Sequence, residues 1–349
     1  MEDSMDGEIG RFIKVWLTTL PCLCYCYYIS STIPKGFSRL LSLIPILYLF
    51  IILPFNLSSF HLGGPTTFFL VWLATFKLLL FSFNQGPLTQ SPNIAHFITL
   101  ATLPINPNKK NHTTQNPSKK WLFFLKVLAL VMIIRAYDHT PNMHPHLILV
   151  LYCCHMYLGI ELVLALCAVP VRTLFPGFEI EPQFDEPYLS TSLQDFWGRR
   201  WNLTVTRTLR PTVYHPVHRI FTNFVCPSCA TSAAMFATFL VSGLMHELIY
   251  YYLARAPPTW EVTCFFVLHG VCTALEVAAK RVALRRGWRL HRAVSGPLTV
   301  AFLAVTARWL FFPQLVRNGV DRKAIGEYAI FVNFFKTKAS SHLYFLNIK

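Results

Sequence analysis

The sequence predicts an all-α protein that crosses a membrane about eight times, with a ninth crossing as the alternative, and three observations support this fold class. Of its 349 residues, 54% are hydrophobic and only 13% are charged. The mean hydropathy of +0.43 is too high for an ordinary soluble domain. Apolar runs long enough to cross a bilayer recur along the chain, and most Lys and Arg residues lie between them. We expect one membrane-embedded domain, 1–349.

The apolar runs define the individual elements. The first run follows an acidic tip, with no basic segment before it and no small-residue cleavage site after it. We therefore expect it to be retained as a span and not removed as a signal peptide. A short run at 325–335 is the candidate for a ninth span. The eight predicted spans are 11–29, 40–55, 66–83, 121–137, 146–169, 230–253, 260–279 and 295–312.

The basic residues predict the orientation of these spans. The segments after the first, third, fifth and seventh runs hold eighteen Lys and Arg residues, and only two, Arg135 at the end of the fourth run and Arg255 after the sixth, fall on the other side. The odd-numbered segments are therefore expected in the cytosol and the N-terminus on the other side. Topology and contact with membrane lipids explain the net charge of +15, and no nucleic-acid partner is expected. The basic C-terminal tail does not fit eight spans, and a ninth would resolve only part of that conflict.

Two predicted cytosolic segments are long. Residues 84–120 end in NPNKKNHTTQNPSKK, a polar stretch without hydrophobic periodicity that is typical of a flexible linker near lipid head groups. Residues 170–229 alternate aromatic and aliphatic residues with Arg and Asp around the motif FWGRRWN. They are expected to lie at the interface or to dip into a protein-lined vestibule. Ser190, Thr191 or Ser192 is expected to cap a helix there.

The run 230–253 contains VSGLMHELIYYY, which places His246 and Glu247 at membrane depth. Ionisable groups there are costly and usually face a protein interior or a wet cavity, so His246 is the first candidate for chemistry. Glu247 lies about 100° around the helix from His246, which argues against a direct pair. HELIY begins like the zinc motif HExxH, but Tyr250 takes the place of the second histidine, so no zinc site is expected. The three tyrosines at 250–252 are typical of an interfacial belt.

Other polar groups have simpler structural interpretations. His269 and Glu276 are seven residues apart and share a helix face, so they either pair with each other or line a chamber, and pairing is favoured. Cys226 and Cys229 form a lone CxxC without a second pair of ligands, and no metal site is expected there.

The succession of SLQDFWGRRWN, SGLMHELIYYY and PTWEVTCFFVLHG resembles the plant wax synthase branch of the membrane-bound O-acyltransferases. The resemblance covers nearly the whole chain, including PKG at 34–36. It implies a helical bundle around an intramembrane reaction chamber, and the esterification of long-chain alcohols with acyl-CoA. The functional histidine of that superfamily falls on His246, and its upstream Asn or Asp in a Trp-rich element falls on Asn202. Close relatives acylate sterols, so a sterol acceptor is the alternative.

The chemistry follows from the residues themselves. Acyl transfer from a thioester to an alcohol needs a base for the hydroxyl proton and the exclusion of water. A histidine buried in a bundle is expected to be neutral and able to accept that proton. Asn202 is expected to orient the base, to orient the acyl carbonyl, or to donate a hydrogen bond to the oxyanion. His246 lies about 25 Å along its helix from the cytosolic end, so either residues 194–202 fold inward or a deep chamber admits an extended thioester.

Acyl-CoA is the expected cosubstrate, and no other cofactor is expected. Arg199 and Arg200, with Trp197 and Trp201, are its candidate contacts, because paired guanidinium donors bind phosphate well. Contact with lipid head groups is an equal alternative for these arginines. The expected partners are acyl-CoA, a long-chain alcohol and lipids of the endoplasmic reticulum membrane. A transporter with a His/Glu proton relay is the alternative of a different class, and no internal symmetry in the sequence supports it.

Overall fold

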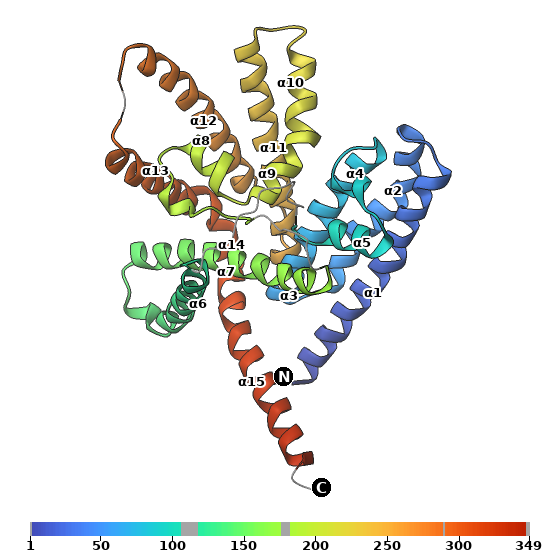
Figure 1. The fold of residues 1–349 in the computed structure, drawn as a ribbon. Helices are drawn as coiled ribbons and strands as arrows, with labels where there is room; N and C mark the ends of the chain where they lie inside the picture. The colour runs from blue at the N-terminus through green and yellow to red at the C-terminus, as the bar shows by residue number, and fades with distance from the viewer. Residues whose placement is uncertain (1, 106–117, 176–181, 289, 347–349) are drawn as a thin grey trace.

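A computed structural model describes residues 2–105, 118–175, 182–288 and 290–346, and these ranges contain helices but no β-strand. The helices surround a central region in which segments far apart in the sequence meet (Figure 1). The C-terminal helix α15 (Val320–Leu346) projects away from this body. The predicted all-α fold class is confirmed.

Seven helical stretches in the described residues are long and apolar enough to cross a membrane, and each overlaps a predicted span. Several comprise more than one element, such as α3 (Phe60–Thr67), η2 (Phe68–Ala74) and α4 (Thr75–Ser82) in the third stretch. The main helices are α1 (Glu2–Thr32), α2 (Phe37–Ile52), α7 (Pro145–Leu174), α11 (Pro227–Ala254), α12 (Glu261–Arg285) and α13 (Arg292–Thr306). The stretches are Met5–Thr32, Phe37–Asn56, Phe60–Ser82, Pro145–Val171, Pro227–Ala254, Glu261–Arg285 and Arg292–Phe311.

The run 121–137 forms a helix that is not among these seven. This helix, α6 (Ser118–Ala136), contains four basic residues in 19, which leaves too short an apolar stretch. Lys126 of α6 forms a salt bridge with Glu161 of α7 (2.7 Å), so α6 is held against α7 by an ion pair as well as by apolar contact. The ninth candidate, 325–335, lies inside α15 and is likewise not among the seven.

Hydrogen bonds between connecting segments agree with the predicted sidedness. At the predicted cytosolic end, the Gly36 N–H donates to the Ser82 carbonyl (2.8 Å). At the opposite end, the Glu8 carboxylate accepts from the Ser59 N–H (2.6 Å) and the Arg255 guanidinium donates to the Leu57 carbonyl (2.9 Å). Each bond joins segments that the distribution of basic residues assigns to the same side.

The described part of the predicted 84–120 loop is not all linker. Helix α5 (Ile94–Thr102) packs into the core formed with α1, α2 and α4, where Phe97 is 0% exposed and Leu100 is 1% exposed. The Lys77 ammonium of α4 donates to the carbonyls of Leu100 (2.5 Å) and Leu103 (2.8 Å). A lysine within a span thus satisfies carbonyls at the end of α5, which lack helical partners. Most of the polar stretch predicted as linker, 106–117, lies outside the described residues.

Residues 182–226, the described part of the segment between α7 and α11, fold into short helical turns; α8 packs against α12, and α10 runs alongside α11 (Figure 1). Among the three candidate caps, Ser192 caps α8: its hydroxyl accepts from the Asp195 N–H (3.1 Å). The elements are η5 (Pro187–Leu189), α8 (Leu193–Asp195), η6 (Phe196–Arg200), α9 (Leu203–Leu209), η7 (Arg210–Tyr214) and α10 (His215–Phe221).

Helices α11 and α12 make the most extensive helix pair of the described structure. Glycines allow this close approach from both sides. A Cβ added at Gly243 of α11 would lie 3.0 Å from the Thr263 Cα, and one added at Gly270 of α12 would lie 2.9 Å from the Phe239 Cβ. Small residues serve this purpose in membrane bundles, where lipid gives helices no hydrophobic reason to associate.

Candidate active site

His246 lies about two turns before the end of α11, in a box of three aromatic rings. The Phe266 ring of α12 stacks on the imidazole with 4.2 Å between centroids and 26° between planes. The Trp72 ring of η2 stands almost perpendicular to it at 5.1 Å, and the Phe311 ring of η8 (Ala307–Phe311) lies at 6.0 Å. Three spans that are distant in the sequence therefore build the surroundings of His246.

The backbone fixes the tautomer of His246. Its Nδ1 lies 2.8 Å from the Ser242 carbonyl oxygen. Because a carbonyl only accepts, Nδ1 carries the hydrogen and Nε2 presents a lone pair. Nε2 forms no hydrogen bond with a described residue, and it is not completely enclosed by them. The imidazole is thus held in the tautomer whose Nε2 presents an unused lone pair.

The Glu247 carboxylate bonds to α12 and not to the adjacent His246. Its carboxylate accepts from the Trp260 N–H (2.9 Å) and from both the N–H (3.4 Å) and hydroxyl (3.1 Å) of Thr263. These donors lie at the start of α12, where backbone N–H groups lack helical partners, so Glu247 caps that helix. As the helical spacing predicted, Glu247 is not the partner of His246.

The prediction of an interfacial tyrosine belt is wrong for two of its three members. Tyr250 is 3% exposed and Tyr252 is 5% exposed. The Tyr250 hydroxyl donates to the Phe311 carbonyl (2.9 Å), and that of Tyr252 donates to the Ile51 carbonyl (2.5 Å). Both tie α11 to other spans within the protein interior, which the run of three identical residues did not reveal.

The FWGRRWN motif folds inward. This is one of the two arrangements expected from the position of His246 about 25 Å along its helix. The Trp197 indole packs on Phe239 and Phe266, the second of which stacks on His246. Its Nε1–H donates to His269 Nδ1 (3.1 Å), so the Nε2–H of His269 must be the donor to the Thr306 hydroxyl (2.9 Å). His269 is 0% exposed with both ring nitrogens occupied, which makes it an anchor for the motif and not a base.

Glu276 does not pair with His269. Its carboxylate accepts from the Leu193 N–H (2.7 Å) and the Gln194 N–H (3.4 Å), and it forms a salt bridge with Lys280 (2.8 Å). It therefore holds α8, the turn that precedes the motif, against α12. The shared helix face was predicted correctly, but its two polar groups bind different parts of the same inserted segment.

Trp201 and Asn202 contact other parts of the structure than His269. The Trp201 ring stacks on Phe196 (5.2 Å, 20°) and packs on Tyr157 of α7 (6.1 Å). Asn202 adopts the left-handed backbone conformation (φ 35°), and its side-chain oxygen accepts from the Val205 N–H (3.4 Å), so it is the N-cap of α9. This capping bond leaves the amide NH₂ of Asn202 available as a donor.

Trp72 connects the two members of the predicted functional pair. It forms an apolar cluster with Val205 and Leu209 of the helix that Asn202 caps, and its ring also contacts His246. The structure therefore brings α9 and His246 to a shared neighbour, although no direct contact joins Asn202 to His246 among the described interactions.

A cavity of about 800 Å³ is lined by residues of η5, α8, η6 and α13. Arg199, Arg200 and Arg292 line it, the last from the start of α13. The Arg200 guanidinium is held by the Asp195 carboxylate (2.8 Å), whereas Arg199 and Arg292 form no ion pair with a described residue. The cavity thus offers two uncompensated positive charges, and neither Trp197 nor Trp201 lines it.

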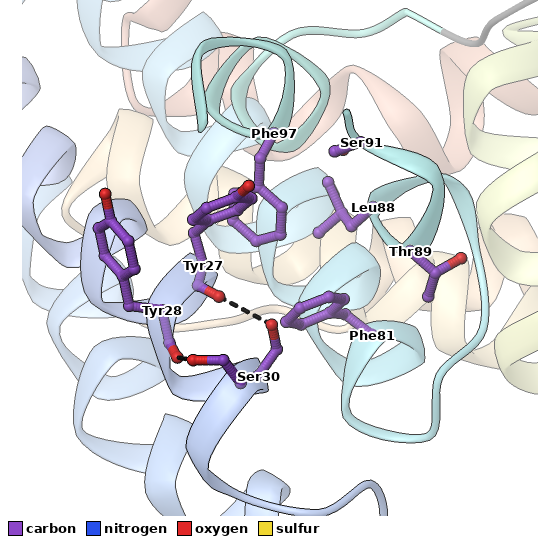
Figure 2. A pocket seen from close by; sticks show the side chains of 9 residues that line it. Tyr27, Tyr28, Ser30, Phe81, Leu88, Thr89, Ser91 and Phe97 are labelled. Atoms are coloured by element: carbon purple, nitrogen blue, oxygen red, sulfur yellow. Dashed lines mark hydrogen bonds between the residues drawn. The ribbon is translucent and has the colours of Figure 1, made fainter. Parts of the chain in front are cut away.

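A second cavity, of about 250 Å³, lies between α1, α4 and α5 and is shown in Figure 2. Aromatic rings of Tyr27, Phe81 and Phe97 form its walls, and the Ser30 hydroxyl at its edge donates to the Tyr27 carbonyl (2.8 Å). No histidine or carboxylate lines it. It lacks the groups that acyl transfer requires.

The Cys226 and Cys229 thiols touch at the exposed start of α11, 2.7 Å apart. No group of three His, Cys, Asp or Glu side chains that is arranged to hold a metal ion occurs among the described residues.

These features define a multi-pass helical membrane protein with a histidine-centred site enclosed by its own helices. Residues 180–268, which include FWGRRWN and His246, match the membrane bound O-acyl transferase family. The chain belongs to this family, in its plant wax synthase branch, as the resemblance of its motifs predicted.

Full-length relatives support this assignment. The chain is 47% identical to the probable long-chain-alcohol O-fatty-acyltransferase 1 of Arabidopsis thaliana over 97% of this chain and 100% of that protein. It is 48% identical to the long-chain-alcohol O-fatty-acyltransferase of Simmondsia chinensis, over 96% and 97% of the two chains. An acyl-CoA–sterol O-acyltransferase of Arabidopsis thaliana is 42% identical over 92% and 95%.

No sequence pattern singled out three aromatic residues of the site. Trp72, Phe266 and Phe311 are ordinary aromatic residues within apolar runs, and nothing in their spacing indicates that they surround His246. Arg292 counted only as one basic residue of a cytosolic segment. A signal exists in local structure, since Trp72 and Phe311 lie in π-helical turns, which often occur at functional sites.

Proposed function

We propose that the protein transfers an acyl group from acyl-CoA to a long-chain alcohol, forming a wax ester and free CoA, with His246 as the general base. The Nε2 lone pair of His246, fixed by the bond from Nδ1–H to the Ser242 carbonyl, is the observation that carries the proposal. The names of the two relatives at 47% and 48% identity support the alcohol acceptor over a sterol. We place the protein in the endoplasmic reticulum membrane.

The reaction follows from the position of this lone pair. Nε2 accepts the alcohol proton as the alcohol oxygen attacks the thioester carbonyl carbon. The carbonyl electron pair moves to oxygen, and it returns as the carbon–sulfur bond breaks. The imidazolium then gives its proton to the departing thiolate, which leaves ester and CoA. The box of Trp72, Phe266 and Phe311 keeps water from the thioester, which would otherwise be hydrolysed.

Asn202 supports the base indirectly in this proposal. Its capping bond to Val205 N–H fixes the first turn of α9, and α9 packs on Trp72 beside His246. Loss of the cap would loosen the wall of the box. The free amide NH₂ keeps open a direct contact with the acyl carbonyl.

The arginine-lined cavity is the proposed site for the phosphates of CoA. Arg199 and Arg292 supply positive charge that no described carboxylate neutralises, and Asp195 is occupied by Arg200. Guanidinium groups bind phosphate oxygens through paired donors. Trp197 and Trp201 shape the segment that forms this cavity but do not face it.

A membrane assay tests the proposed reaction. Membranes that contain the protein are given labelled palmitoyl-CoA with hexadecanol or with a sterol, and His246→Ala serves as the inactive variant. We expect wax ester from the alcohol, little sterol ester, and loss of product in the variant. Unchanged product in His246→Ala would contradict the mechanism, and sterol ester alone would contradict the acceptor.

A truncated thioester tests the cavity separately. Arg199→Gln with Arg292→Gln is expected to raise the KM for palmitoyl-CoA at least tenfold. The same variant should behave like the unmodified protein with S-palmitoyl-N-acetylcysteamine, which has no phosphates. Arg286→Gln, an exposed arginine outside the cavity, is the matched control. An equal effect on both thioesters would show that these arginines act on folding or on the acyl chain instead.

A further inference from the structure

Trp72 is buried with an unused hydrogen-bond donor. The residue is 1% exposed, and its indole Nε1–H is enclosed without an acceptor among the described residues. Leaving a buried N–H without a partner is energetically costly. Such a group in a native site calls for an explanation, and a role in function is one of them.

The position of Trp72 agrees with a functional role. Its ring is the one at 5.1 Å from the His246 ring and at 85° to it. Phe266 and Phe311 contact the imidazole too, but their rings have no polar hydrogen. Trp72 is therefore the sole donor among the three rings that touch the proposed base.

The backbone at Trp72 is irregular as well. Residues Phe68–Ala74 form the π-helical segment η2 within the third span. A π-helical segment changes the direction of side chains relative to a regular α-helix and is frequently retained at functional sites. A phenylalanine would supply an aromatic ring at this position without an unsatisfied N–H, so the ring contact with His246 alone does not explain the indole.

We propose that the indole N–H of Trp72 donates a hydrogen bond to the carbonyl oxygen of the acyl thioester. This inference rests on the proposed function of His246. When the alcohol oxygen bonds to the carbonyl carbon, the negative charge on the carbonyl oxygen falls beside Trp72, while Nε2 of His246 holds the proton. A fixed donor about 3 Å from an oxyanion stabilises the transition state more than the ground state.

The thioester must reach an enclosed group. The apolar cluster around Trp72 includes Met245, whose unbranched side chain is the one most easily displaced. Entry of the acyl group beside this residue would exchange an unsatisfied N–H for a hydrogen-bonded one. The energy lost by burying the N–H in the free protein is then recovered when substrate binds.

The test replaces Trp72 by residues that keep the ring and remove the N–H. Trp72→Phe, and Trp72 replaced by benzothienylalanine, which keeps the bicyclic shape, are expected to lower kcat about 100-fold or more. The KM for palmitoyl-CoA should change less than threefold. With benzothienylalanine the thermal midpoint should stay the same or rise, since this variant loses an unsatisfied donor and not a hydrogen bond. Trp72→Phe also leaves a cavity, so its midpoint should fall. A purely structural tryptophan would show the opposite pattern, with lower stability and little change in kcat.

Trp16→Phe is the matched control, because the Trp16 Nε1–H is also enclosed without an acceptor among the described residues, yet its ring does not contact His246. This control should keep full activity. Benzothienylalanine at 72 with kcat within threefold of the unmodified protein would overturn the proposal. So would a fall in kcat that accompanies an equal loss in a Trp16→Phe protein.

His246→Ala separates this inference from the proposed function. If His246→Ala keeps activity, the proposed base is wrong. If His246→Ala is inactive while both Trp72 variants are fully active, the base stands and the oxyanion donor is wrong. The result expected is inactivity of His246→Ala together with the kcat loss at Trp72.

Discussion

Gly243→Ala is expected to reduce activity much more than stability. The added Cβ would lie 3.0 Å from the Thr263 Cα and 3.3 Å from the Phe266 Cβ. The first neighbour is backbone and cannot rotate away, so α11 and α12 must separate by about 0.5–1 Å to restore normal contact. Because Phe266 stacks on His246, this separation moves the wall against which the base is held.

The opposing free energies nearly balance in this variant. Overpacking of this kind costs about 1–3 kcal/mol. Alanine in place of glycine inside a helix regains about 1 kcal/mol. The free energy of unfolding should therefore fall by about 0–2 kcal/mol. Misplacement of a catalytic group by about 1 Å can cost 100-fold in rate, so we expect kcat to fall about 10- to 100-fold.

The assay measures wax-ester formation and thermal unfolding on the same detergent-solubilised preparation. Gly10→Ala is the control, since no atom lies within 4 Å of a Cβ added there, and it should keep its activity. Gly270→Ala should behave like Gly243→Ala, because its Cβ would press on Phe239, against which Trp197 packs. Full activity in both interface variants would refute the idea that the α11–α12 spacing positions His246.

Two further predictions follow from the ends of α11. Glu247→Gln should lower the thermal midpoint, because it weakens the capping of α12 by about 1–3 kcal/mol, while the folded protein keeps its kcat. A large loss of kcat at normal stability would contradict this structural role of Glu247. Hydrogen bonds from the Cys229 thiol and N–H lower the pKa of Cys226, so its thiolate persists to lower pH than that of an ordinary thiol. In sealed microsomes an impermeant maleimide should label Cys226 without detergent and at a lower pH than an ordinary thiol, and Cys229→Ala should shift this labelling to higher pH. Labelling only after detergent would contradict the predicted topology.

The sequence alone determined the class of protein and most of its spans, and it singled out the residue that we propose as the base. Composition and run length are properties of the chain, and a bilayer imposes its thickness on any helix that crosses it. Histidine at membrane depth is costly enough to need a reason, so His246 stood out without any structure. The distribution of basic residues grouped the connecting segments by side, and hydrogen bonds such as that between Glu8 and Ser59 agree with the grouping.

Only the tertiary structure decided which groups meet. Helical spacing placed His269 and Glu276 on one face, but the partners of that face are Trp197 and the Leu193 N–H, which come from a segment about eighty residues earlier in the chain. Such contacts depend on how an inserted segment packs, and no local pattern encodes that.

The same limit applies to the ring box around the base. Trp72 and Phe311 have the composition of any apolar run, and they became candidates only when folding brought them to His246. The sequence singled out the proposed proton acceptor because an ionisable group is costly to place within a membrane. The structure decided its surroundings and its proposed oxyanion donor, because aromatic side chains acquire such roles from their position alone.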